Sequence, residues 1–131
     1  MSRMDEILRT SHTIAVVGLS NKRFRPSYGV AEYMKRAGFR IIPVNPGAAE
    51  IMGETCYPDL ESIPDGVDIV DIFRRSEYVP DIVDAAIRKG AKAIWMQEGV
   101  YHEEAAKKAE AAGIAVVMDR CILKDHRRLV G

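Results

Sequence analysis

The chain has 131 residues, of which 47% are apolar and 29% charged, with 19 basic and 19 acidic side chains. A formal net charge of zero argues against a general nucleic-acid-binding or anionic-membrane-binding surface. No apolar run approaches the roughly 20 residues of a membrane span. The length predicts one domain over residues 1–131, large enough to fold without a disulfide or a metal. We expect it in the cytoplasm, because the N-terminus lacks a signal-peptide segment and the two cysteines are far apart.

Apolar runs alternate with amphipathic segments along the chain. The segment before the first apolar run carries apolar side chains at helical spacing, and glycine closes three of the amphipathic segments. Strands are predicted at residues 13–17, 40–44, 67–73, 93–96 and 114–118. Helices are predicted at residues 2–10, 26–36, 76–89, 102–112 and 123–129, with a loop containing a short extended piece at 50–57.

This alternation predicts an α/β fold: a doubly wound, parallel, five-stranded, Rossmann-like sheet. Right-handed crossovers then place helices on both faces. Asp68 and Asp71 interrupt the third predicted strand, which indicates a position nearer an edge of the sheet. Ligands of such sheets bind beyond the carboxyl ends of the strands. Four segments should converge there: 18–27, 45–47, 73–75 and 96–99.

The segment after the first strand has the character of a phosphate site. Gly18 ends the strand, but the next glycine is Gly29, so the dinucleotide fingerprint G-x-G-x-x-G is absent. Polar and basic side chains replace the missing glycines, and the following helix offers its positive N-terminus to an anion. For any single basic side chain, a solvated surface position is an equal alternative. The polar and basic residues of this segment are Ser20, Asn21, Lys22, Arg23, Arg25 and Ser27.

The other strand ends carry polar groups too. Asn45 stands where NAD sites usually offer an acid to the ribose, which counts against NAD. Arg74 and Arg75 follow the third strand, and strand alternation allows only one of them to face a ligand. Glu98, after Gln97, either accepts hydrogen bonds from a ligand or caps the following helix.

No catalytic constellation is evident in the sequence. Cys121 and His126 are five residues apart, a poor angle for a nucleophile and its base on one helix. The cysteines and histidines lack metal-ligand spacing. We therefore assign no catalytic or metal-binding residue, and whether the chain is an enzyme stays open.

Six short motifs, in order, carry a resemblance over nearly the whole chain: IAVVGLS, RPSY, IPVNP, VDIFRR, WMQEG and VMDRC. With them the chain resembles the small stand-alone CoA-binding proteins of the YccU-like family. Their domain is similar to the N-terminal CoA-binding domain of the succinyl-CoA synthetase α subunit.

The resemblance implies that coenzyme A (CoA) or an acyl-CoA is the ligand. The glycine-rich turn of the synthetase corresponds to residues 18–23, at the nucleotide and phosphates. Its Pro-Gly-Lys segment corresponds to Pro46-Gly47, but Ala48 replaces the lysine. Its Thr-Glu-Gly turn corresponds to residues 97–99, near the pantetheine or adenine end.

The synthetase's phosphorylated histidine lies in a second domain that has no counterpart in this sequence. The resemblance therefore implies a binding or regulatory module without catalysis of its own. The alternatives are an NAD(P)-binding oxidoreductase and an acyl-CoA ligase subunit that needs a partner chain. A homodimer or a protein partner is left open. The candidate CoA-binding residues are Gly18, Ser20, Asn21, Lys22, Arg23, Arg25, Ser27, Asn45, Pro46, Arg74, Gln97 and Glu98.

Overall fold

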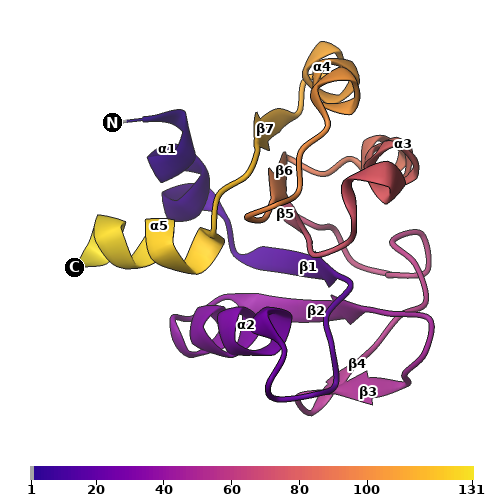
Figure 1. The fold of residues 1–131 in the computed structure, drawn as a ribbon, viewed down its shortest axis with the longest axis vertical. Coiled ribbons are helices and arrows are strands. Elements are labelled where there is room, and N and C mark those ends of the chain that lie inside the picture. The colour runs from indigo at the N-terminus through magenta and orange to yellow at the C-terminus, as the bar shows by residue number, and fades with distance from the viewer. Residues whose placement is uncertain (1) are drawn as a thin grey trace.

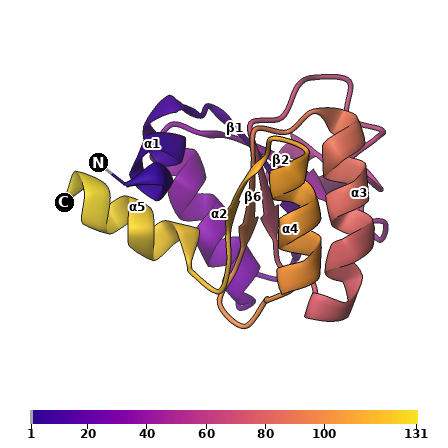
Figure 2. The same cartoon turned by 90° about the horizontal axis from the view of Figure 1, so that it is seen from above.

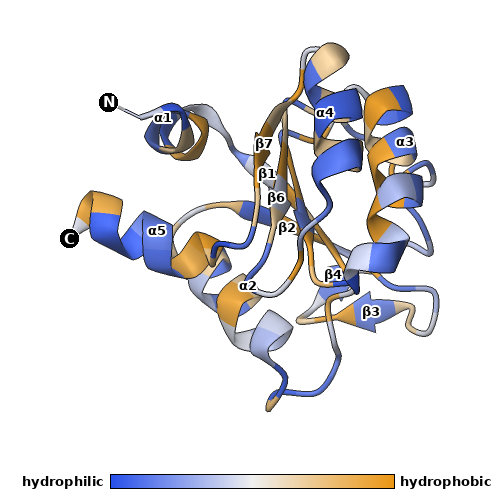
Figure 3. Cartoon of the chain, turned by 45° about the horizontal axis from the view of Figure 1, so that its top comes forward, coloured by the Kyte–Doolittle hydropathy of each residue, from blue (hydrophilic) through white to orange (hydrophobic). Residues whose placement is uncertain are grey.

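A computed structural model describes residues 2–131 and shows a three-layer α/β arrangement (Figure 1). Apolar runs buried on both faces form the strands, and amphipathic segments form the helices that cover them (Figure 3). None of the described helices is long and apolar enough to span a bilayer. The helices are α1 (Arg3–Thr10), α2 (Pro26–Arg36), a 3-10 turn η1 (Ser76–Tyr78), α3 (Val79–Lys89), α4 (Glu103–Ala111) and α5 (Ile122–Val130). The strands are β1 (Thr13–Val17), β2 (Arg40–Val44), β3 (Glu50–Ile51), β4 (Glu54–Thr55), β5 (Ile69–Ile72), β6 (Ala93–Met96) and β7 (Ala115–Val117).

The main sheet is parallel, with five strands in the order β2-β1-β5-β6-β7. This confirms the predicted Rossmann-like fold. The chain winds from β1 outward to β2 and then in the other direction through β5, so the switch point lies between β1 and β5. In such sheets a crevice opens at that point, beyond the carboxyl ends of the strands.

The two faces of the sheet are covered by different helices, as predicted (Figure 2). One core layer forms between the sheet and α3 and α4, with Val70 and Ile94 fully buried in it. The other forms under α1, α2 and α5, around Ile14 and Trp95. Pro43, which cannot donate to a ladder, lies on the edge strand β2. Residues 50–57, predicted as a loop with a short extended piece, contain the small antiparallel hairpin of β3 and β4.

The predicted edge position of the third strand is wrong, because β5 is the central strand. Asp68 precedes β5, and its Oδ2 accepts hydrogen bonds from the N–H groups of His12 (2.8 Å) and Thr13 (3.1 Å) at the start of β1. Asp71 lies within β5, between Val16 and Trp95 in the register, and is 1% exposed. Its buried Oδ1 accepts no hydrogen bond from any described residue. Burial raises the pKa of this carboxyl well above its usual range.

Candidate functional site

A pocket of about 580 Å³ opens at the carboxyl edge of the sheet. That volume lies within the range of small-molecule and cofactor sites. The predicted convergence is confirmed, because all four segments after β1, β2, β5 and β6 contribute to its wall. The wall consists of Gly18, Ser20, Lys22, Arg25, Pro26, Ser27, Val30, Asn45, Phe73, Gln97, Glu98, Val100 and Cys121.

Gly18 allows the chain to turn from β1 into this wall. Its φ of +89° is unfavourable for any side chain. A Cβ here would lie 3.1 Å from the carbonyl oxygen of Phe73 and 2.9 Å from Cδ of Arg74. The glycine is therefore required by packing within the protein, whatever ligand approaches it.

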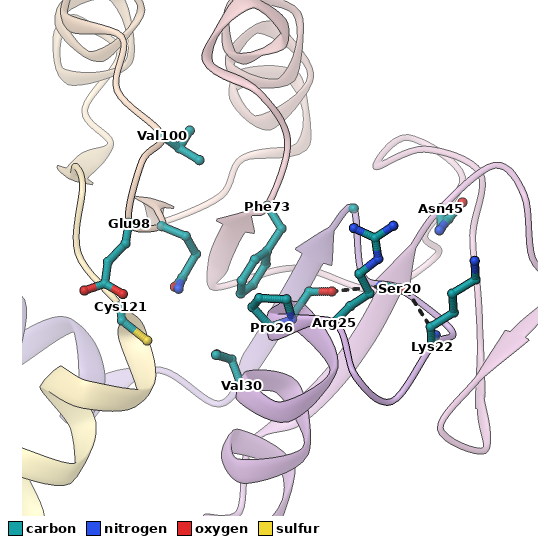
Figure 4. A pocket seen from close by; sticks show the side chains of 13 residues that line it. Ser20, Lys22, Arg25, Pro26, Val30, Asn45, Phe73, Glu98, Val100 and Cys121 are labelled. Atoms are coloured by element: carbon teal, nitrogen blue, oxygen red, sulfur yellow. Dashed lines mark hydrogen bonds between the residues drawn. The ribbon is translucent and has the colours of Figure 1, made fainter.

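The loop between β1 and α2 is held in shape by its own serines. Ser27 Oγ accepts a hydrogen bond from Ser20 N (3.0 Å), and Ser20 Oγ accepts one from Lys22 N (3.0 Å) (Figure 4). Arg25 is the N-cap residue of α2, and it makes no side-chain capping bond. The first turn of α2 contains no acidic residue. The positive end of the helix is thus left for an anion from outside the chain.

The basic side chains of this loop have no acidic partners. Lys22, Arg23 and Arg25 form no ion pair with any residue between 2 and 131. Lys22 and Arg25 instead flank the ring of Phe24, at 6.0 and 5.7 Å from its centroid. Although the chain as a whole is neutral, this end of the pocket carries uncompensated positive charge.

The other end of the pocket is polar and not basic. Figure 4 shows Glu98 and Cys121 on the opposite side from Lys22, with Phe73 and Pro26 between them. Glu98 accepts hydrogen bonds from Lys124 Nζ at 2.9 and 3.2 Å, so its charge is compensated. The pocket therefore changes along its length from a cationic end, past an apolar middle, to a polar end.

Asn45 links two of the loops at this edge. Its Nδ2 donates to the carbonyl oxygen of Leu19 (3.0 Å), and its Oδ1 accepts from Gly47 N (2.8 Å). An aspartate could not donate the first of these bonds. The asparagine that departs from the NAD pattern is thus explained by a structural role.

Four of the predicted site residues lie outside the wall of this pocket. Asn21 and Arg23 belong to the same loop, but they do not line it. Pro46 and Arg74 line a separate cavity of about 290 Å³. The Arg74 guanidinium stacks on Tyr78, 4.4 Å from the ring centroid.

Comparison with known proteins agrees with this geometry. Residues 12–127 match the model of a family described as the CoA binding domain. The chain belongs to the CoA-binding domain family. This match distinguishes the CoA-binding domain family from the other nucleotide-binding families that share the fold.

The relatives of this chain include short proteins and parts of long enzymes. The chain is 40% identical over 125 residues to the uncharacterized protein YneT of Bacillus subtilis, covering 95% of this chain and 93% of that one. It is 34% identical over 100 residues to the ADP-forming acetate–CoA ligase II of Archaeoglobus fulgidus, covering 75% of this chain but only 15% of the ligase. A solved structure of a hypothetical protein from Pyrococcus horikoshii matches with a TM-score of 0.95 and 41% identity, over 98% of this chain and 90% of that one.

The pocket of this CoA-binding domain also includes residues outside the predicted set. Phe73, Val30 and Val100 form the apolar middle, and Cys121 lies at the polar end. The apolar residues carry no chemical signal in the sequence. The sequence suggests His126 as the one possible partner of Cys121, but the Nδ1 of His126 lies 2.9 Å from the hydroxyl oxygen of Tyr33. Among residues 2–131 no cluster of His, Cys, Asp and Glu could hold a metal ion.

Proposed function

We propose that this protein binds CoA or an acyl-CoA in the pocket at the carboxyl edge of the sheet, as a binding or regulatory module of the cytoplasm. One observation carries the proposal: Lys22 and Arg25 lack acidic partners and stand beside an uncapped helix N-terminus. CoA has phosphates at one end and an uncharged pantetheine arm ending in a thiol. This gradient matches the change from a cationic to a polar wall along the pocket.

Each phosphate contact has a chemical basis. The helix N-terminus and the loop N–H groups donate to phosphate oxygens, and an arginine can do so through two parallel bonds. Phe73 and Val30 offer apolar contact to the pantetheine arm. Glu98 and Gln97 line the opposite end of the pocket, and we expect them to bind polar groups farther along the arm.

Calorimetry tests the proposal with CoA, NAD and ATP titrated into the full chain. Replacing both Lys22 and Arg25 by alanine should weaken CoA binding about 10- to 100-fold, which corresponds to about 1.4–2.8 kcal/mol. The matched control replaces Arg9 and Lys107, which are exposed and lie outside the pocket, and so removes the same charge. Affinity for CoA should also fall as salt is added. Tight binding of NAD without any response to CoA would overturn the proposal.

A second function is favoured by the likeness to part of an acetate–CoA ligase. The CoA site would then serve a partner chain that carries out the ligation, since this chain spans only 15% of that ligase. Co-purification from the native host distinguishes the two functions. A stoichiometric complex with a nucleotide-binding subunit supports the ligase, and recovery of the protein alone supports a stand-alone module.

A further inference from the structure

Cys121 places a thiol in the wall of the pocket. It is the N-cap residue of α5, at the end opposite Lys22 (Figure 4). Its side chain makes no capping bond, and its Sγ forms no hydrogen bond with a described residue. Cys56, by contrast, lies outside this pocket, and its thiol donates to the carbonyl oxygen of Asn45 (3.4 Å).

A second polar group at the same end has an unused hydrogen-bond donor. Gln97 is 4% exposed and lines the pocket. Its Oε1 accepts from Ile122 N (3.0 Å), the residue after Cys121. Its Nε2 donates to no residue between 2 and 131. This N–H donor lines the pocket and no described residue accepts from it, so it is available to a carbonyl oxygen of a ligand at this end of the pocket.

The backbone around Cys121 is held firmly. Arg120 N donates to the carbonyl oxygen of Met96 (3.2 Å), and the carbonyl oxygen of Arg120 accepts from Trp95 Nε1 (2.9 Å). The Arg120 guanidinium donates two hydrogen bonds to the buried carboxylate of Asp125 in a bidentate arrangement, at 2.9 and 2.7 Å. The thiol is therefore kept against the pocket by contacts on both sides.

We propose that Cys121 forms a reversible mixed disulfide with CoA. The inference rests on the proposed function, because bound phosphates at Lys22 and Arg25 direct the pantetheine arm toward this thiol. The reaction partner is a CoA disulfide. The Cys121 thiolate attacks one sulfur of the CoA disulfide, and the sulfur–sulfur bond breaks as a new one forms to Sγ. The second CoA leaves as a thiolate with the electron pair and takes up the proton that Cys121 released. Gln97 Nε2 donates to the pantetheine carbonyl nearest the new bond.

The test incubates the reduced full chain with CoA disulfide and measures intact mass and modified peptides. We expect one CoA per chain, attached at Cys121 and released by excess dithiothreitol. Pantethine has the same arms without the nucleotides and phosphates, and it should react at least about tenfold more slowly, equivalent to the loss of one good phosphate contact. Replacing Lys22 and Arg25 by alanine should slow the reaction with CoA disulfide but not with pantethine.

The cysteine variants complete the design. Cys121→Ser should abolish labelling, and Cys56→Ser should leave it unchanged. Equal labelling of the two cysteines, or equal rates with CoA disulfide and pantethine, would overturn the inference. Calorimetry of the wild type and of Cys121→Ser with reduced CoA separates the two proposals. If the wild type binds reduced CoA but is not labelled by CoA disulfide, only the mixed disulfide is refuted. If the wild type does not bind CoA at all, the proposed function itself is refuted.

Discussion

Replacing Gly18 by alanine should destabilise the fold even in the absence of ligand. The φ of +89° imposes backbone strain of about 1–3 kcal/mol on any residue with a side chain. The new Cβ would also meet the Phe73 carbonyl oxygen at 3.1 Å and Arg74 Cδ at 2.9 Å. The Phe73 backbone continues the central strand and cannot move freely, so overpacking adds about 1–3 kcal/mol. The total is about 2–6 kcal/mol, a large part of the about 5–15 kcal/mol that stabilises a domain.

Thermal unfolding followed by circular dichroism measures this effect. For a chain of this length the unfolding entropy is about 0.28 kcal/mol/K, so Gly18→Ala should lower Tm by about 7–20 °C. Gly29→Ala is the matched control. Gly29 lies inside α2 with open space around its Cα, so alanine there should add about 0.5–1 kcal/mol and raise Tm by about 2–4 °C. A Tm for Gly18→Ala within about 2 °C of the wild type would refute the reasoning.

Three further predictions concern buried or partly buried ionisable groups. The folded Asp71 carboxyl keeps its proton to a higher pH than the unfolded one, so this group favours folding most below about pH 3.9 and progressively less as the pH rises toward the folded pKa. The free energy of unfolding of Asp71→Asn relative to the wild type should therefore rise as the pH increases from 4 to 7, as measured by urea unfolding. Parallel curves of unfolding free energy against pH for the two proteins would contradict this. Asp125→Ala removes a buried carboxylate from two half-exposed arginines and should cost about 1–3 kcal/mol, whereas Asp65→Ala, at an exposed ion pair, should cost less than about 1 kcal/mol. Burial lowers the pKa of His126, so its protonation favours the unfolded chain and stability falls as the pH drops through about 6.5. His126→Asn should reduce that fall between pH 7 and 5 in the same assay, and an unchanged slope would exclude His126 as its source.

The secondary structure and the fold class could be predicted because their signals are local. Apolar runs define the strands of a sheet covered on both faces, and left-handed glycines such as Gly90 close the helices. The central position of β5 could not be predicted, because the strand buries the carboxyl group of Asp71, which is an exception to the usual exposure of such groups. A carboxyl without a hydrogen-bond partner is rarely buried, and Asp71 is buried in the centre of the sheet.

The site could be located from the sequence, but its individual contacts could not. The carboxyl ends of parallel strands meet at one edge of the sheet for any set of side chains. The sequence therefore predicts that Lys22 and Gln97 lie at the same edge, and both line the pocket. Side-chain direction is a tertiary property, and Arg74 turns away to stack on Tyr78. Cys121 comes to the pocket because the segment between β7 and α5 packs against Gln97, a contact across 25 residues.

The two hydrogen bonds of Asn45 couple the motions of two loops at the rim of the pocket. Leu19 belongs to the loop after β1 and Gly47 to the turn after β2, and one amide side chain holds both. Local opening of either loop must break bonds to the same group, so the two should open as one cooperative unit. In native-state hydrogen exchange, the Gly47 amide should then gain protection when a ligand occupies only the Lys22 end. A ligand contact at the end of β1 would thereby reduce the local opening of the turn after β2 without any change in the average structure.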